Sequence, residues 1–341
     1  MIDLTQSHDV LGAYHSINFD SIRKKYHDPA TQYAFDVLDE NVTTGYLIKL
    51  AAFRHLRDLQ RQGDDDFPFY YDVGEVDKIL KFAKICPNVD TGEPTQLMPW
   101  QQFIFGMLFG WRDELAHKRF TRVILSVARS QGKTYLMAIY MVYSFLIESI
   151  GLSNQDFLVT AENYDQTGKL YGYITDMLKK IFEEQPVFAK LAQEDDIVIH
   201  EHTGVNMRKF NNNLRPLSFN AGKYDSYHFT TAIFDEIGNI HSREGTKKIV
   251  SGQIKKPKHQ YIEISTAYPD PSVPFHDDQK VVQQAMERDF NREADQELGL
   301  IWAQDSLDET FKEETWVKSN PLLDLKDQRD VLLNGLRDKR D

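Results

Sequence analysis

The sequence has little cysteine, a deficit of positive charge and no long apolar run. Of its 341 residues only Cys86 is a cysteine, which excludes an intrachain disulfide and a cysteine-based zinc site and favours a reducing, intracellular compartment. The longest apolar stretch, 138–147, is about half a membrane span, so we expect a buried helix there and no membrane partner. The first residues lack a basic stretch followed by an apolar run, which argues against a signal peptide and secretion.

The charge is unevenly distributed. The chain has 40 Lys+Arg against 52 Asp+Glu, a formal net charge of -12, which disfavours a protein that coats nucleic acid through bulk charge. One window, 240–259, opposes the trend with six basic residues and one acidic residue, a net charge of +5. Its cations are Arg243, Lys247, Lys248, Lys255, Lys256 and Lys258. Such a window is either a local binding surface or a solvated helix face.

Periodicity predicts an α/β protein. Residues 1–45 are polar and weakly periodic, and we expect an arm or loosely attached helices there. Helical patterns follow at 45–62, 73–86 and 99–111. From residue 121 on, short apolar runs alternate with helical patterns, which predicts a mostly parallel sheet covered by helices on both faces. Strands are expected at 121–127, 156–161, 197–202, 205–210, 216–219, 230–235, 259–266 and 299–303, and helices at 132–150, 163–184, 242–252 and 276–291.

The most informative motif is SVARSQGKT, residues 126–134, between a predicted strand and a long predicted helix. In a phosphate loop the backbone N–H groups of the turn and helix start face phosphate oxygens, the lysine reaches the β and γ phosphates, and the Thr hydroxyl holds Mg²⁺. Lys133 and Thr134 fit these positions, but Val127 stands where the first glycine of the usual pattern belongs. A lysine at an ordinary helix start is the alternative.

A second motif is the acidic end of the predicted strand at 230–235. Asp235 can hold the water shell of Mg²⁺, and the adjacent Glu236 can polarise an attacking water. About 100 residues separate Lys133 from Asp235, enough for two strand–helix units between them. A strand that happens to end in acids is the alternative, and it is disfavoured by the phosphate loop upstream.

Three further features are weaker on their own. Ser265, Thr266 and Ala267 end the next predicted strand and could sense the γ-phosphate. Gln101 opens a predicted helix, and its amide could bind an adenine edge or simply be a polar helix start. Arg129 lies inside the phosphate loop, where a guanidinium could stabilise developing charge or could face solvent.

In this order, these residues resemble the ATPase half of the large terminase subunit of tailed bacteriophages. The resemblance covers roughly residues 45–325. It runs through RHLRDL (54–59), FPF (67–69), MPWQ (98–101), FGW (109–111), VARSQGKT (127–134), TAENYDQTGKLY (160–171), IFDEI (233–237), ISTA (264–267) and WVKSNPLL (316–323). The phosphate loop of this family lacks the first glycine and contains an arginine, so Val127 and Arg129 fit it.

The resemblance implies a role for each candidate, on a P-loop ATPase core with the additional strand and catalytic glutamate of ring motors. Asp235 would serve the metal together with Thr134, and Glu236 would be the catalytic base, with Arg129 as an arginine acting in cis. Ser265, Thr266 and Ala267 would couple hydrolysis to movement. The implied ATP- and Mg²⁺-binding residues of the Walker A and Walker B motifs and the adenine contact are Gln101, Ser130, Gln131, Gly132, Lys133, Thr134 and Asp235.

The resemblance also implies partners and a place of action. They are double-stranded DNA, the portal ring and the small terminase subunit, with a ring of five copies on the procapsid portal in the host cytoplasm; the isolated chain could be monomeric. We expect an N-terminal region at 1–95, the ATPase core at 96–270 and a lid or linker at 271–341. Only about 70 residues follow the core, too few for the nuclease domain of this family, so we expect no nuclease activity.

Several alternatives remain open at this point. A helicase-like or remodelling ATPase would need a second ATPase-like domain, and a nucleotide-binding switch would bind without turnover. Part of the basic window at 240–259 would face DNA or a neighbouring subunit, or else be a solvated helix. An arginine that acts across a subunit boundary could be any of Arg112, Arg119, Arg122, Arg208 and Arg215.

Overall fold

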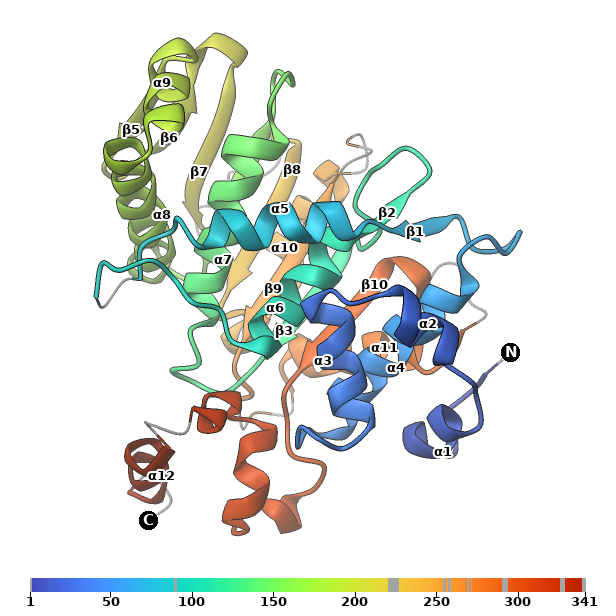
Figure 1. The fold of residues 1–341 in the computed structure, drawn as a ribbon. Helices are drawn as coiled ribbons and strands as arrows, with labels where there is room; N and C mark the ends of the chain where they lie inside the picture. Colours follow the sequence, from blue (N-terminus) through green and yellow to red (C-terminus); the bar gives the residue numbers. More distant parts are fainter. Residues whose placement is uncertain are drawn as a thin grey trace.

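An eight-stranded sheet forms the centre of the molecule (Figure 1). The computed structural model describes residues 2–88, 91–219, 227–253, 256, 259–268, 270, 272–289, 294–325 and 329–338. The strand order is β10-β3-β9-β8-β4-β7-β6-β5. The strands are β3 (Arg122–Ser126), β4 (Asp156–Ala161), β5 (Ile197–His200), β6 (Gly204–Met207), β7 (Asn212–Ser218), β8 (Phe229–Asp235), β9 (Gln260–Ser265) and β10 (Glu297–Ile301).

The sheet is mostly parallel, as the sequence predicts. All neighbours from β10 to β7 run parallel, whereas β5–β6 and β6–β7 are antiparallel. The register pairs Ser126 with Ser265 and Asp235 with Ile264, so β3, β8 and β9 end at the same edge. The expected strand at 205–210 ends early, because the chain turns through a 3₁₀ helix at Arg208–Phe210 and a left-handed Asn211.

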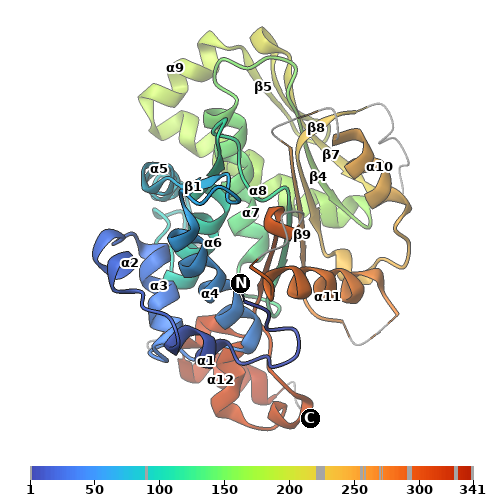
Figure 2. The same ribbon diagram turned by 90° about the vertical axis from the view of Figure 1, so that its right-hand side faces the viewer.

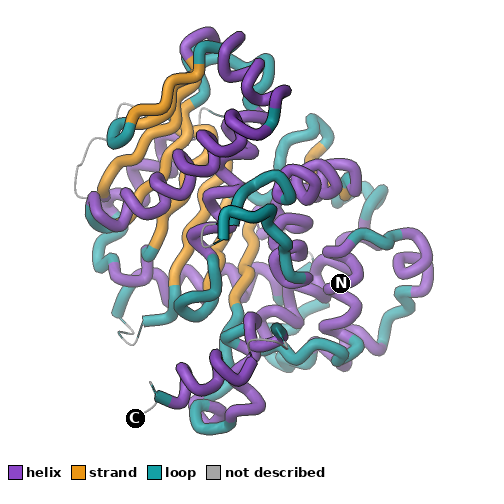
Figure 3. Tube along the Cα trace, turned by 60° about the vertical axis from the view of Figure 1, so that its left-hand side comes forward, coloured by secondary structure: helices purple, strands orange, loops and turns teal. Residues whose placement is uncertain are grey.

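Helices cover both faces of the sheet (Figures 2 and 3). One face carries α6 (Pro99–Phe105), α7 (Lys133–Tyr143) and α8 (Tyr164–Glu184), and the other carries α10 (Glu244–Gln253) and α11 (Pro274–Met286). α6 and α7 each continue into a π-helix, at Gly106–Gly110 and Ser144–Glu148. Outside the eight-stranded sheet also lie α5 (Val73–Ala83), α9 (Pro186–Glu194) and the antiparallel pair of β1 (Phe69–Tyr71) with β2 (Trp111–Asp113).

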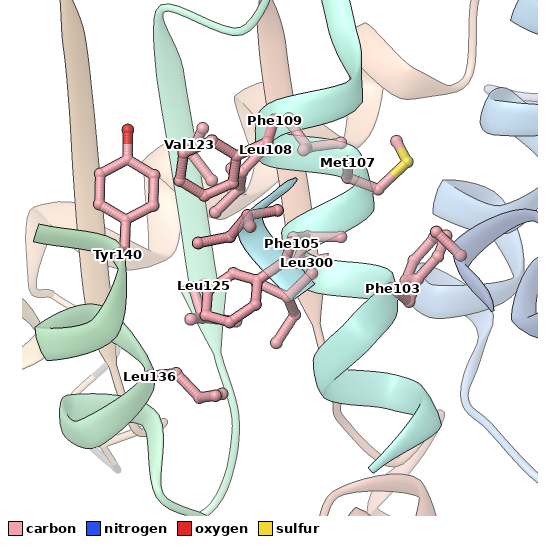
Figure 4. Close-up of a cluster of buried hydrophobic side chains, with 14 of the residues drawn as sticks. Phe103, Phe105, Met107, Leu108, Phe109, Val123, Leu125, Leu136, Tyr140 and Leu300 are labelled. Carbon is pink, nitrogen blue, oxygen red and sulfur yellow. The ribbon is translucent and has the colours of Figure 1, made fainter. Parts of the chain in front are cut away.

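The core between α6, α7 and the sheet fixes the start of α7. Phe105, Phe109, Leu125 and Leu136 are all at most 1% exposed, and Figure 4 shows them packed between the helices and β3. Close-packed apolar side chains hold their neighbours in single rotamers. The end of β3 and the first turn of α7 therefore have a rigid support.

The N-terminal region contradicts one expectation. It forms α1 (Val10–His15), α2 (Asp20–Lys25), α3 (Pro29–Leu38) and α4 (Tyr46–Arg61), and the prediction that residues 1–45 are loosely attached is wrong for α3. Phe35 and Leu38 are at most 1% exposed. α3 approaches the π-helix so closely that a Cβ on Gly106 would lie 2.1 Å from the Cβ of Ala30. Because polar residues surround α3 in the sequence, the hydrophobic periodicity did not predict its buried apolar face.

The region after residue 270 is also more closely tied to the core than expected. β10 is the edge strand of the main sheet and pairs with β3, and α11 packs on β10, so the core extends to Ile301. Beyond it lie 3₁₀ helices at Leu307–Glu309, Glu313–Lys318 and Pro321–Asp324, and α12 (Arg329–Arg337). In Figure 1 these segments lie below the sheet, at the end where α7 begins. None of the helices in the described ranges has the length and apolar character needed to cross a bilayer.

Candidate nucleotide-binding site

The phosphate loop leaves β3 and enters α7 at the carboxyl edge of the sheet. Its turn needs two left-handed residues, Ser130 with φ 62° and Gly132 with φ 78°. A side chain at Gly132 would be strained because L-residues rarely adopt this conformation. The loop is also anchored to the neighbouring strand, because Val127 N donates to Ser265 O at 3.3 Å. The backbone amides at the start of α7 are thus held at the sheet edge, an arrangement suited to anions.

The two central motifs meet at one hydrogen bond. Thr134 Oγ1 donates to Asp235 Oδ2 at 3.0 Å. Asp235 is 5% exposed, and its other oxygen, Oδ1, has no hydrogen-bond partner among the described residues. Burial, with the neighbouring Glu236 charge, raises the pKa of Asp235 to about 6. A buried carboxylate with a spare oxygen beside a Thr hydroxyl is a donor set that fits Mg²⁺.

Lys133 and Glu236 form the second contact of the site. Lys133 Nζ lies 3.2 Å from Glu236 Oε1, and Tyr268 OH donates to Glu236 Oε2 at 3.1 Å. The Lys133 side chain is 6% exposed and that of Glu236 25%. Glu236 itself has a left-handed backbone conformation, with φ 55°. The carboxylate therefore stands between the phosphate-loop lysine and the segment after β9.

The segment after β9 is bound to the loop that carries Glu236. Ser265 Oγ accepts a hydrogen bond from Gly238 N at 3.0 Å and donates to Thr266 O at 2.9 Å. The Thr266 hydroxyl is buried and finds no partner within the described part of the chain. Ala267 is exposed. The three residues expected to act in coupling thus lie at the same edge as the phosphate loop.

The other residues expected to contact nucleotide lie beside the phosphate loop, as Gln101 does, or within it, as Arg129 and Gln131 do. Gln101 Oε1 accepts from Met98 N at 2.9 Å, and its Nε2 lies 4.0 Å from where a Cβ on Gly132 would be. Arg129 lies over the ring of Tyr268, with its Cζ 5.5 Å from the ring centroid. Gln131 faces the C-terminal segments instead, because its Oε1 accepts from Leu322 N at 2.9 Å. Next to it, Ala128 N donates to Ser319 O at 3.2 Å.

Comparison with known protein families identifies the family of this chain. A family model described as "Terminase large subunit, ATPase domain" matches residues 99–283, more than half of the chain. The chain belongs to this family. The matched range contains the phosphate loop, the acidic end of β8 and the segment after β9.

One solved large terminase shares the fold of this chain. The HK97 bacteriophage large terminase is 18% identical with a TM-score of 0.59, over 75% of this chain and 51% of that chain. This chain therefore spans about half the length of that terminase. The ATPase domain of the Thermus phage P74-26 large terminase is 14% identical with a TM-score of 0.36, over 45% of this chain and 62% of that chain. A search of curated proteins gives no match.

The basic window of this terminase ATPase domain is partly occupied by internal contacts. Arg243 forms an ion pair with the buried Asp278 of α11 at 2.5 Å, and Lys248 lies 3.3 Å from Glu244. Lys256 Nζ donates to Asn154 O at 3.0 Å, and Lys247 is exposed on α10. Lys255 and Lys258 lie outside the described residues. DNA or subunit contact through this window stays a prediction, and Lys247 is its most accessible described cation.

The structure ranks the five arginines considered for action across a subunit boundary. Arg119 is fully buried against Asp58, and Arg112 is 9% exposed beside Glu75. Arg122 and Arg215 are held by Asp278 at 2.7 Å and Asp156 at 3.1 Å. Arg208, with 58% of its side chain exposed, is the most accessible of the five.

The sequence did not predict two contacts of the site, Tyr268 with Glu236 and Gln131 with Leu322. Tyr268 directly follows the Ser265–Ala267 segment, and that adjacency was the only signal for it. The contact between Gln131 and Leu322 joins residues 191 positions apart, and nothing in the local pattern of either residue predicts it.

Proposed function

We propose that this chain is the ATP-hydrolysing motor domain of a phage large terminase, which drives double-stranded viral DNA into a procapsid. The observation that carries the proposal is the meeting of Thr134 Oγ1 and Asp235 Oδ2 at 3.0 Å, with Asp235 Oδ1 buried and unpartnered among the described residues. Membership of the terminase ATPase family supports the same reading.

In this proposal the phosphate loop holds the nucleotide. The amides of Ser130, Gln131 and Gly132 and the Lys133 ammonium face the phosphate oxygens, and Gln101 contacts adenine. Thr134 and Asp235 hold Mg²⁺, which would neutralise charge on the β and γ phosphates. The closeness of the Gln101 amide to Gly132 supports its place beside the nucleotide.

Hydrolysis in this proposal depends on Glu236 and Arg129. Glu236 accepts the proton of the attacking water, and the Arg129 guanidinium stabilises charge that develops on the γ-phosphate. Lys133 leaves Glu236 when it pairs with phosphate, which frees the carboxylate to act as a base. Lys133 Nζ now lies 3.2 Å from Glu236 Oε1, so pairing with phosphate would break this ion pair. The segment after β9 couples the loss of the γ-phosphate to movement of the rest of the motor. This segment consists of Ser265, Thr266 and Ala267.

The remaining parts of the proposal concern the assembly. The chain would act in a ring, of five copies, on the portal of the procapsid in the host cytoplasm, together with the small terminase subunit. Lys247 and its basic neighbours would face DNA or the adjacent subunit. DNA cleavage would belong to residues beyond the ATPase core and is not expected of this chain.

The test is ATP turnover by the chain with and without duplex DNA, alongside a nuclease assay on the same DNA. We expect Mg²⁺-dependent release of phosphate and intact DNA. A Lys133→Ala chain serves as the blank, because it loses the ammonium that faces phosphate, and Lys190→Ala, an exposed lysine on α9, is the matched control.

Three results would contradict the proposal. Nucleotide binding without turnover under every condition would favour a switch. ATP-dependent strand separation would favour a helicase-like enzyme. Unchanged nucleotide binding in Lys133→Ala would contradict the phosphate-loop assignment.

A further inference from the structure

The Glu236 carboxylate has two partners of different kinds. One oxygen lies 3.2 Å from Lys133 Nζ, and the other accepts a hydrogen bond from Tyr268 OH at 3.1 Å. If Lys133 turns to a phosphate, the first contact is lost and the hydrogen bond from Tyr268 stays. The tyrosine is therefore placed to hold the carboxylate at the moment when water must be activated.

The ring and the backbone of Tyr268 both have neighbours that hold them. Arg129 lies over it at 5.5 Å, within the range of a cation–π contact. A Cβ built on Gly238 would come within 2.7 Å of the ring atom Cδ2, so the ring packs directly on the loop after β8. The Tyr268 carbonyl accepts from His276 Nε2 at 3.1 Å. A hydroxyl on a ring held in this way has little freedom to leave its acceptor.

Tyr268 also connects the base to the segment after β9. Ser265 binds Gly238 N through its hydroxyl, and three residues later Tyr268 binds Glu236, which lies two residues before Gly238. The two loops are thus joined at two points. A shift of the segment after β9 would move the hydroxyl relative to the carboxylate.

We propose that Tyr268 is a positioning residue for Glu236, and this inference rests on the proposed ATPase function. Its O–H donates to one carboxylate oxygen and leaves the other oxygen to accept the proton of the attacking water. The phenol keeps its own proton throughout. The water oxygen forms a bond to the γ-phosphorus while the bond from that phosphorus to the β–γ bridging oxygen breaks, and ADP leaves with the bridging oxygen. Without this hydrogen bond, Glu236 would sample several rotamers and the fraction of productive geometries would fall.

The test is the Tyr268→Phe variant, which keeps the ring over Arg129 and removes only the hydroxyl. We expect kcat to fall about tenfold, the scale of one hydrogen bond to a charged group, while the Kd for ATP measured by calorimetry stays unchanged. The matched control is Tyr46→Phe, because Tyr46 OH also donates to a glutamate carboxylate, that of Glu287 at 2.8 Å. The control should retain its kcat.

A second variant separates positioning from a general effect on structure. In a Glu236→Gln background the base is already absent, so adding Tyr268→Phe should lower the residual rate by less than twofold. An unchanged kcat in Tyr268→Phe, or an equal loss in both backgrounds, would overturn the inference while leaving the ATPase function intact. A wild-type chain without any turnover would instead overturn the proposed function, and the inference with it.

Discussion

Two buried charge clusters in this chain differ in whether every carboxylate oxygen has a partner of opposite charge or a hydrogen-bond donor. The arginine cluster, which consists of Arg54, Asp58, Arg61, Arg119 and Asp295, lies between α4 and the start of β3. Asp58 is 2.7 Å from Arg119 and 3.1 Å from Arg61, and Arg119 Nε donates to the Asp295 carbonyl at 2.8 Å. Asp58 Oδ2 has no geometrically ideal hydrogen bond among the described residues, but it keeps the ion pair with Arg119. In the phosphate-loop cluster, by contrast, Asp235 Oδ1 has neither a hydrogen bond nor an ion pair within the described ranges.

The pKa values of the two aspartates record this difference. Burial opposes ionisation at both, but Arg119 and Arg54 hold the pKa of Asp58 below its usual value. Burial and the Glu236 charge raise that of Asp235 to about 6. The arginines around Asp58 stabilise its charge within the fold. Asp235 lies beside the phosphate loop with one oxygen unpartnered among the described residues, and we expect it to receive a cation from outside.

The largest effect is expected in the arginine cluster. Asp58→Asn should lower the free energy of unfolding by about 3 to 5 kcal/mol, because it leaves the buried arginines of this cluster with Asp295 as their remaining carboxylate. Urea unfolding at neutral pH measures this change. The control, Asp176→Asn on the exposed face of α8, should change the free energy by less than about 0.5 kcal/mol. An equally small effect of Asp58→Asn would remove the contrast between the clusters.

The second effect concerns the unused oxygen of Asp235. Asp235→Asn should not destabilise the free chain, because it removes a buried charge that lacks a counter-ion. It should abolish most of the stabilisation by Mg²⁺ and a non-hydrolysable ATP analogue, which for wild type is about 2.7 kcal/mol at a hundredfold excess over Kd. Thermal unfolding with and without the ligands measures it. A full ligand shift in the variant would show that Asp235 does not hold the metal.

The last prediction extends the comparison of Asp58 with Asp235 to a third buried acid, Glu263, and concerns the pH dependence of stability. Glu263 of β9 is fully buried between Arg122 and Asp278, and burial raises its pKa to about 7. The folded chain therefore binds this proton more tightly than the unfolded chain, so stability falls as pH rises from about 4.5 through 7. Glu263→Gln should have a higher free energy of unfolding than wild type at pH 8, and the same free energy of unfolding as wild type below about pH 4.5. Parallel curves for the two chains across pH would contradict it.

Most of the central fold could be predicted because its strands are short, apolar and bounded by turns. The run DFLVTA gave β4 at its observed bounds, and the acidic end of β8 placed Asp235 at the sheet edge. The pairing of β10 with β3 could not be predicted, since it joins segments about 175 residues apart with no local signal. The same holds for the arginine cluster, where α4, Arg119 and Asp295 meet only after folding.

The parts of the site that could be predicted from the sequence are those whose reactive residues lie next to one another in short motifs. Lys133 and Thr134 follow a strand, Asp235 and Glu236 end another, and parallel strands bring such ends together. Tyr268 and Leu322 carry no such signature, because a tyrosine hydroxyl and a backbone amide acquire a role only through their position in space. Sequence patterns thus indicate which groups react, and packing determines what holds them.

The most direct test of the central claim is single-turnover hydrolysis by Glu236→Gln with Mg²⁺, with the protein in excess over ATP and at a concentration well above the Kd for ATP. The claim is that Glu236, placed between Lys133 and Tyr268, is the base of an ATPase built on the phosphate loop. We predict a loss of roughly 10² to 10⁴ in the rate of the chemical step, with an unchanged Kd for ATP. Wild-type turnover by this variant, with the same Kd, would contradict the account.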